Sequence, residues 1–430
     1  MIAAPWDKVP PREQLFVLVT GANSGVGLGI CERLIDDFLA TRPLTSHLIL
    51  IPTTRSVRKS RESVESLRQH LRRTATTSPA LRSRAGSSYY DPDDTLARVH
   101  LLSTQLDLCD LPSVYACAAS LVAGTLTDPT DPVSPPRACK IPASTPSSST
   151  PASAAGPAST GPASSPTSSQ RVSSPATPEE TPGRVVWTSS IEPQARHLRL
   201  DDFQGVETEG PYESSKRLTD VLSLSSHLPA TQRIAKSYFT PEDPQIAQRL
   251  PVRPSFYLTH PGVVASNLFP VPFPFILFWA YKFALYLARW LGSPWHPVTG
   301  YNGAVAPVWI ALQDDETLEE LEAKKIKWGS AASFSGRQDV KKTEVEGGGW
   351  EGAVEDRESL ARDPATGVLR KAVGRNPGAR DLTKEQLVDF EALGVDIWTE
   401  MERLRHQWEE FLDIRGEGVN GHSRTNGKSG

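Results

Sequence analysis

The sequence predicts an α/β fold built on a parallel, doubly wound sheet, and three observations support this prediction. A short apolar strand at residues 15–20 runs directly into the glycine-rich turn TGANSGVG. Further apolar segments of strand length follow, and segments with apolar residues at helical spacing alternate with them. Such β-α-β-α alternation is typical of parallel sheets that are covered by helices on both faces.

The elements can be taken in chain order. Before residue 126, strands are expected at 15–20, 47–55 and 98–108, and helices at 27–40, 56–73 and 111–124. After residue 183, we expect strands at 183–190 and 255–262, and helices at 212–228 and 299–313. Residues 327–352 read as loops or a hairpin, and residues 383–413 as a terminal helix or helix pair.

The alternation breaks at a segment rich in Pro, Ser, Thr and Ala. Between Ile141 and Pro182 there is no Leu, Phe, Tyr, Trp or Met, so this segment cannot bury enough apolar surface to offset its ordering entropy. The predicted organisation is the N-terminal half of a cofactor-binding domain at 1–126, a disordered segment at 127–183, a catalytic half at 184–315, an extension at 316–414 and a disordered tail at 415–430.

Composition excludes several classes of function. The formal net charge is −4, so general nucleic-acid binding is not indicated, and the Arg-rich stretch at 55–73 also contains acids, as a solvated helix face does. The four cysteines form no CxxC or Cys/His cluster, which argues against a metal site and a disulfide framework. The N-terminal residues contain no apolar core typical of a secretory signal.

The glycine-rich turn predicts a phosphate-binding loop. Glycines allow a tight turn and a close approach of the backbone to a pyrophosphate, and the following helix offers free N–H groups and the positive end of its dipole. The residues expected to bind a dinucleotide here are Gly21, Asn23, Ser24, Gly25, Val26 and Gly27.

The end of the second strand indicates which dinucleotide. A site for an unphosphorylated ribose needs an acidic residue there. The sequence instead has IPTTRS, and Arg55 can pair with a 2′-phosphate, which favours NADPH over NADH. Asp107, after the third strand, would lie near the adenine, although a turn or helix cap is the alternative reading.

A second motif, YESSK, indicates carbonyl reduction. Tyr212 and Lys216 are four residues apart on a predicted helix and therefore share one face. A phenol has a pKa near 10 in water, and a neighbouring ammonium lowers it, which makes the phenol a better proton donor to a ketone oxygen. A hydroxyl from Ser190, or alternatively Ser189, at the preceding strand end can hydrogen-bond to the same oxygen.

Taken in order, TGANSGVG, WTSS, YESSK and HPGVVAS resemble the short-chain dehydrogenase/reductase family, whose fold is a Rossmann-type sheet. More narrowly, TGANSGVGLGICERL, LTHPGVVASNLF and YNGAVAPVWIAL resemble the fungal 3-keto-steroid reductases of sterol C-4 demethylation and their animal counterpart, 17β-hydroxysteroid dehydrogenase type 7. The resemblance implies hydride transfer from NADPH to the C-3 ketone of a 4-demethylated sterol intermediate in ergosterol synthesis.

The resemblance also assigns roles to individual residues. Ser190 would polarise the ketone, Tyr212 would donate the proton, and Lys216 would hold the ribose and tune Tyr212. The nicotinamide pocket would be lined by Pro261, Gly262, Val263 and Ser266.

The chain departs from the family pattern at one place. The family has a strand and a helix with an active-site Asn where this chain has its Ser/Pro segment, and no Asn occurs between Asn23 and Asn267. Three explanations are open: a divergent or mis-spliced reading frame, an inactive copy, and a sheet that closes up without the strand. The alternative functions are accordingly another short-chain reductase of lipophilic carbonyls, or a non-catalytic membrane scaffold.

Residues 268–292 are strongly apolar and aromatic, but Lys282 and Arg289 interrupt them. An interfacial or substrate-gate helix on a membrane is favoured over a spanning helix, and a buried core helix is the alternative. The resemblance implies the cytosolic face of the endoplasmic reticulum and lipid droplets, with the sterol C-4 oxidase and the C-3 decarboxylating dehydrogenase as partners.

Overall fold

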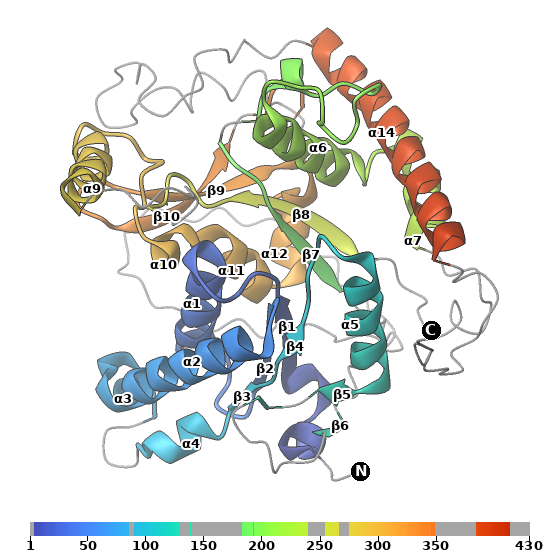
Figure 1. Ribbon diagram of the computed structural model, residues 1–430. Helices are drawn as coiled ribbons and strands as arrows, with labels where there is room; N and C mark the ends of the chain where they lie inside the picture. Colours follow the sequence, from blue (N-terminus) through green and yellow to red (C-terminus); the bar gives the residue numbers. More distant parts are fainter. Residues whose placement is uncertain are drawn as a thin grey trace, which may run out of the picture.

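The computed structural model describes residues 4–85, 90–126, 128–129, 137–138, 183–191, 193–239, 254–265, 275–343, 345–348 and 384–412. Most of the predicted disordered segment and the tail lie outside the described residues. Figure 1 shows two halves, with the sheet β1–β4 in the lower half and the sheet β7–β10 in the upper half. Helices α10 and α11 lie between them (Figure 1).

The N-terminal half follows the predicted alternation closely. Its elements are β1 (Gln14–Val19), α1 (Gly25–Thr41), β2 (His47–Thr54), α2 (Val57–Thr77), α3 (Pro79–Ala85), α4 (Pro92–Leu96), β3 (Val99–Leu101), β4 (Thr104–Gln105) and α5 (Leu111–Ala123). Strand β2 pairs in parallel with β1, β3 and β4. The strand expected at 98–108 is therefore two short strands. Between them, the Ser103 hydroxyl donates to the carbonyl of Pro52.

The C-terminal half contains a second four-stranded sheet. Its elements are β7 (Arg184–Thr188), α6 (Pro211–Ser225), α7 (Pro229–Phe239), β8 (Ser255–His260), α9 (Phe275–Trp290), α10 (Gly300–Gly303), α11 (Val305–Leu312), α12 (Asp315–Glu320), β9 (Lys327–Ala332), β10 (Gln338–Thr343) and α14 (Lys384–Phe411). Strands β7, β8 and β9 are parallel, and β10 pairs antiparallel with β9, which confirms the hairpin reading. The two residue pairs β5 (Thr125–Leu126) and β6 (Arg137–Ala138) form a small separate ladder.

The sheet is divided between β1 and β7. Each of these strands has one partner among the described strands, β2 for β1 and β8 for β7. Central strands of a parallel sheet are normally buried on both faces, as β2 is here. In contrast, Leu18 of β1 is 40% exposed and all five residues of β7 are half-buried. Among the described strands, none lies between β1 and β7.

Helix packing joins the two halves. Ala304, between α10 and α11, and Val308 of α11 are buried in the same core as Leu34 and Phe38 of α1. The backbones of α1 and α10 touch because Gly29 meets Gly300, and a Cβ atom built on Gly29 would lie 2.3 Å from the carbonyl carbon of Gly300. The first glycine-rich turn is thereby fixed to the half that carries YESSK.

Candidate active site

The glycine-rich loop has the backbone shape that a phosphate site needs. Gly21 and Gly25 have φ angles of +65° and +57°, which favour glycine over any other residue. A Cβ atom on Gly27 would lie 2.3 Å from the carbonyl oxygen of Gly21, so only glycine lets α1 start this close to the turn. The space above Gly21 is open, since nothing lies within 4 Å of the position of a Cβ there.

The N-terminus of α1 completes this anion site. Ser24 is the N-cap residue, and its side chain accepts no capping hydrogen bond, while the Asn23 amide donates to the Ser24 hydroxyl at 3.4 Å. The first N–H groups of α1 are therefore available to a ligand, and the helix dipole favours a negative one. The open space at Gly21 and the free N–H groups of α1 fit the pyrophosphate of a dinucleotide, as the sequence predicts.

Two further predicted cofactor residues follow the next strands. Arg55 comes directly after β2, is exposed, and makes no hydrogen bond or ion pair with the described residues. Asp107 is half-buried, and its carboxylate accepts from the N–H of Cys109 at 3.1 Å. The turn-forming alternative for Asp107 is thus present in the structure, while Asp110 occupies the N-cap of α5 without a side-chain capping bond.

Helix α6 brings the YESSK pair together. Pro211 is the first residue of α6, a position where a backbone N–H has no partner within the helix. Tyr212 is therefore in the first turn. Tyr212 is 43% exposed, and the Nζ of Lys216 lies 5.8 Å from the centre of its ring. Lys216 Nζ also donates to the carbonyl of Thr188, at the end of β7, at 3.0 Å. Burial lowers the pKa of the Lys216 ammonium, and the Asp220 carboxylate acts in the opposite direction.

The two candidate serines differ in their surroundings. Ser189 is 2% exposed, and its hydroxyl lies 2.5 Å from Oδ1 of Asp220, to which it donates. A hydroxyl has a single proton to donate, so Ser189 is turned toward the protein interior. Ser190 is the next residue along the chain and is 9% exposed. This difference favours Ser190 as the hydroxyl that polarises a ketone.

The segment after β8 lies next to the end of β7. The N–H of Ser189 donates to the carbonyl of Thr259 at 2.7 Å, so Pro261 follows immediately beside the serines. Gly262 has a φ of +67°, and a Cβ there would lie 2.8 Å from the carbonyl oxygen of Trp295. Val263 exchanges backbone hydrogen bonds with Trp295 and Val298.

This segment also contacts the first loop through α10. A Cβ on Gly303 would meet Pro261, and a Cβ on Gly300 would lie 2.2 Å from the carbonyl oxygen of Gly25. Two of the predicted site segments, the glycine-rich loop and the segment after β8, are therefore held to α10 by glycine contacts. Ser266, the fourth residue predicted for the nicotinamide pocket, lies outside the described residues. Within the described ranges no group of His, Cys, Asp and Glu side chains could hold a metal ion.

The structure also shows residues that support the candidate site and that no sequence motif indicated. Gly29 and Gly300 lock α1 onto α10, and no motif reading singled them out. Asp220 and Lys327 form an ion pair at 2.8 Å beneath Ser189, with each side chain 1% exposed. The signal for Asp220 was available, because it follows Lys216 by four residues and so extends the same helix face. For Lys327 the sequence offers no signal.

Several curated proteins with similar sequences are named 3-keto-steroid reductases. The chain is 47% identical to the 3-keto-steroid reductase ERG27 of Gibberella zeae, and the alignment covers 96% of this chain and 98% of that protein. It is 34% identical to the 3-keto-steroid reductase erg27 of Aspergillus fumigatus, covering 93% and 95%. No family model matches the chain. An NADP-analogue complex of an alcohol dehydrogenase from Thermococcus sibiricus aligns at 12% identity with a TM-score of 0.27, which is too low to compare folds.

The first of these alignments is longer than the part of this chain that it covers. It spans 471 positions, and 96% of this 430-residue chain is about 413 residues. About 58 positions of the alignment therefore have no counterpart in this chain.

Proposed function

Because the chain belongs to the 3-keto-steroid reductase family of short-chain dehydrogenases/reductases, we propose that it reduces the C-3 ketone of a 4-demethylated sterol intermediate with NADPH. The observation that carries the proposal is the pairing of Tyr212 and Lys216 beside the end of β7. Another short-chain reductase of lipophilic carbonyls would use the same pair. The family membership favours the sterol.

The chain's own residues have separate tasks in this reaction. NADPH, when bound, supplies the hydride. The loop at Gly21–Gly27 would hold its pyrophosphate, and Lys216 would hold its ribose. Ser190 hydrogen-bonds to the ketone oxygen and so favours the negative charge that develops there. Tyr212 donates the proton that converts this oxygen to a hydroxyl.

The ammonium of Lys216 supports Tyr212 by charge. It lies near the ring and is fixed by the carbonyl of Thr188, so it favours the phenolate that remains after the proton has left. The family's active-site Asn is missing from the sequence, and the proposal requires the Ser-Tyr-Lys set to act without it.

A direct assay tests the proposed function. We expect the purified, detergent-solubilised chain to consume NADPH with a 3-keto sterol and to form the 3-hydroxy product, identified by mass spectrometry. NADH should be the poorer donor, and Arg55→Glu should lower the NADPH-to-NADH ratio of kcat/KM at least about tenfold, because a carboxylate repels the 2′-phosphate. Lys59→Glu, in the first turn of α2, is the control for the change in charge.

Two results would contradict this proposal. A folded chain that binds NADPH and leaves the ketone unchanged would favour the scaffold alternative. If Arg55→Glu leaves the NADPH-to-NADH ratio of kcat/KM unchanged, Arg55 does not bind the 2′-phosphate.

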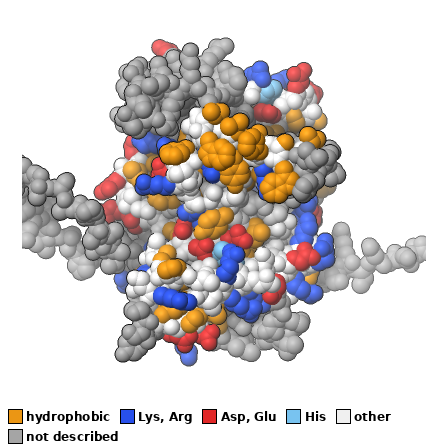
Figure 2. Space-filling model, turned by 90° about the vertical axis from the view of Figure 1, so that its left-hand side faces the viewer, with side chains coloured by type: hydrophobic (Ala, Val, Ile, Leu, Met, Phe, Trp, Pro, Cys, Tyr) orange, Lys and Arg blue, Asp and Glu red, His pale blue; other side chains and the backbone are white. Residues whose placement is uncertain are grey.

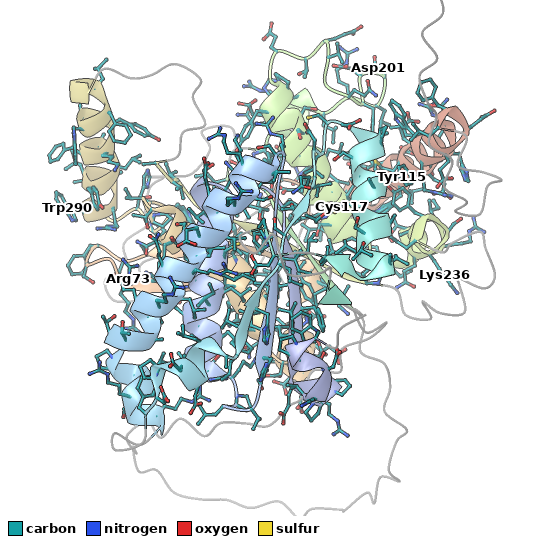
Figure 3. The ribbon with its side chains drawn as sticks, turned by 60° about the horizontal axis from the view of Figure 1, so that its bottom comes forward. Arg73, Tyr115, Cys117, Asp201, Lys236 and Trp290 are labelled. Carbon is teal, nitrogen blue, oxygen red and sulfur yellow. The ribbon has the colours of Figure 1, made fainter. Side chains whose placement is uncertain are left out.

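We propose in addition that α9 docks on a membrane surface. Figure 2 shows hydrophobic side chains gathered on the face that carries this helix, and Leu277, Trp279, Phe283, Leu287 and Trp290 are each 41–59% exposed. Lys282 lies over the ring of Phe278, and Arg289 over that of Tyr286. Figure 3 shows Trp290 at the edge of the molecule, away from both sheets. No helix in the described part of the chain has the length and hydropathy to cross a membrane.

Aromatic and basic side chains on one exposed helix suit a lipid–water interface. Docking there would give access to a sterol dissolved in the bilayer. The cytosolic face of the endoplasmic reticulum and the lipid droplet are the proposed locations, and the other enzymes of sterol C-4 demethylation are the proposed neighbours.

Vesicle flotation tests the docking surface. We expect the chain to float with phosphatidylcholine vesicles containing phosphatidylserine. The affinity for these vesicles should fall at least about 100-fold in the variant Trp279→Glu/Phe283→Glu/Trp290→Glu. Each of these changes removes apolar area and adds a charge that the anionic lipid repels. The control, Leu108→Glu/Val122→Glu/Val206→Glu, adds the same charges at other exposed apolar positions. Equal flotation of the two variants would refute α9 as the contact.

A further inference from the structure

A buried carboxylate lies directly behind the proposed catalytic pair. Tyr212, Lys216 and Asp220 are spaced four residues apart on α6, so all three lie on one face of the helix. Tyr212 is exposed at one end of this row, Lys216 is half-buried in the middle, and Asp220 is 1% exposed at the other end. The row leads from the substrate side of the helix into the core.

Both oxygens of the Asp220 carboxylate are engaged. Oδ2 accepts from Nζ of Lys327, the first residue of β9, at 2.8 Å. Oδ1 accepts from the Ser189 hydroxyl at 2.5 Å. Lys216 donates to the carbonyl of Thr188 at 3.0 Å. Thr188 and Ser189, at the end of β7, are therefore hydrogen-bonded to adjacent turns of α6. The next residue is Ser190.

The charges around Asp220 are unbalanced. Burial lowers the pKa of the ammonium or guanidinium of Lys216, Arg217 and Lys327, and the Asp220 carboxylate opposes this effect for all three. The other groups that face the cluster are Tyr212 on α6, His260 on β8, and Glu346 after β10, which faces Arg217. Burial and the charge of Lys327 hold the pKa of His260 far below its usual value, so His260 is neutral. Asp220 is therefore the carboxylate that these three cations share.

A buried ion pair with good geometry is seldom needed for stability alone, since an apolar pair of similar size often serves as well. Resting on the proposed function, we propose that Asp220, anchored by Lys327, is a positioning residue for the reduction. It fixes the end of β7 so that Ser190 rather than Ser189 meets the ketone, and it keeps Lys216 in its ammonium form.

Single substitutions of Asp220 or Lys327 leave an unpaired buried charge and can unfold the chain. The test therefore uses two double variants of the full chain. Asp220→Leu/Lys327→Met removes both charges and the acceptor for Ser189. Asp220→Asn/Lys327→Met removes both charges but keeps an oxygen that accepts from Ser189.

In the Leu/Met variant, kcat should fall about tenfold or more, the scale expected for the loss of one hydrogen bond to a charged group. The KM for NADPH should change less. In the Asn/Met variant, kcat at neutral pH should recover. Both variants remove the Asp220 carboxylate, which raises the pKa of Lys216, and the Lys327 ammonium, which repels Lys216. Because Asp220 is the charge with the larger effect on Lys216, the alkaline limb of the kcat profile should move to lower pH in both variants.

A second readout needs no sterol substrate. Labelling with an amine-reactive reagent, followed by mass spectrometry, gives the pH at which Lys216 becomes reactive, and exposed Lys8 serves as an internal control. We expect the midpoint for Lys216 to move to lower pH in both variants, and that for Lys8 to stay. If the wild-type chain leaves the sterol unchanged, the proposed function fails and the labelling still tests Asp220. An unchanged kcat profile and an unchanged Lys216 midpoint in folded variants would overturn the inference and leave the pair a structural role.

Discussion

Tyr212→Phe is expected to reduce the turnover of a 3-keto sterol by about 100-fold or more at saturating NADPH and sterol. The change removes one oxygen atom, and with it the proton donor. General acid catalysis by a positioned side chain is worth about 10²–10⁴-fold, so the loss should appear in kcat. The binding of NADPH, followed by nicotinamide fluorescence, should change little.

The fold should tolerate this substitution. Tyr212 is 43% exposed, and its hydroxyl makes no hydrogen bond to the described residues, so we expect the free energy of unfolding to change by about 0.5 kcal/mol or less. The control is Tyr90→Phe, which removes a hydroxyl that donates to the carbonyl of Ala75 at 2.6 Å. That variant should lose about 1 kcal/mol of stability and keep its kcat. Turnover by Tyr212→Phe within about threefold of wild type would assign the proton to another donor.

Gly29→Leu is expected to have the largest effect on stability. A Cβ atom at this position would lie 2.3–2.6 Å from backbone atoms of Gly300 and Tyr301, and backbone cannot move aside as a side chain can. Overpacking of this kind typically costs about 1–3 kcal/mol and occasionally more. For a chain of this size we expect the Tm to fall by about 2–5 °C, measured by circular dichroism.

The damage should extend to the cofactor site. Gly300 also touches Gly25, so a displaced α10 moves away from the loop that holds the pyrophosphate, and the affinity for NADPH should fall as well. Ala40→Leu, which adds the same side chain at an exposed position near the end of α1, is the matched control and should leave both quantities nearly unchanged. A wild-type Tm in Gly29→Leu would show that the two halves do not depend on this contact.

The local pattern of the sequence was sufficient for most of the secondary structure. The strands at 15–20, 47–55 and 255–262 and the helices at 27–40, 111–124 and 212–228 lie within a few residues of β1, β2, β8, α1, α5 and α6. The helix expected at 299–313 is broken at Ala304, and helix α7 and the strand break at Leu102–Ser103 were not predicted. These deviations depend on contacts with distant residues, such as the bond from Ser103 to Pro52.

A gap in the sheet was also predictable, because a segment of Ser, Pro, Thr and Ala has too few large apolar residues to form a central strand. Among the described strands, none lies between β1 and β7. Sequencing of the transcript decides between a spliced-out unit and a genuine loss.

Local sequence was enough to predict the chemistry of the candidate site. Residue type and short spacing are sufficient to place Tyr212 and Lys216 on one helix face, and glycines in a strand–turn–helix are sufficient to indicate a phosphate loop. Only the tertiary structure decided which serine is turned into the core, that Asp220 and Lys327 lie beneath it, and that Gly29 meets Gly300. The physical reason is that these contacts join residues 31, 107 and 271 positions apart, and side chains brought together by packing leave no periodic signal along the chain.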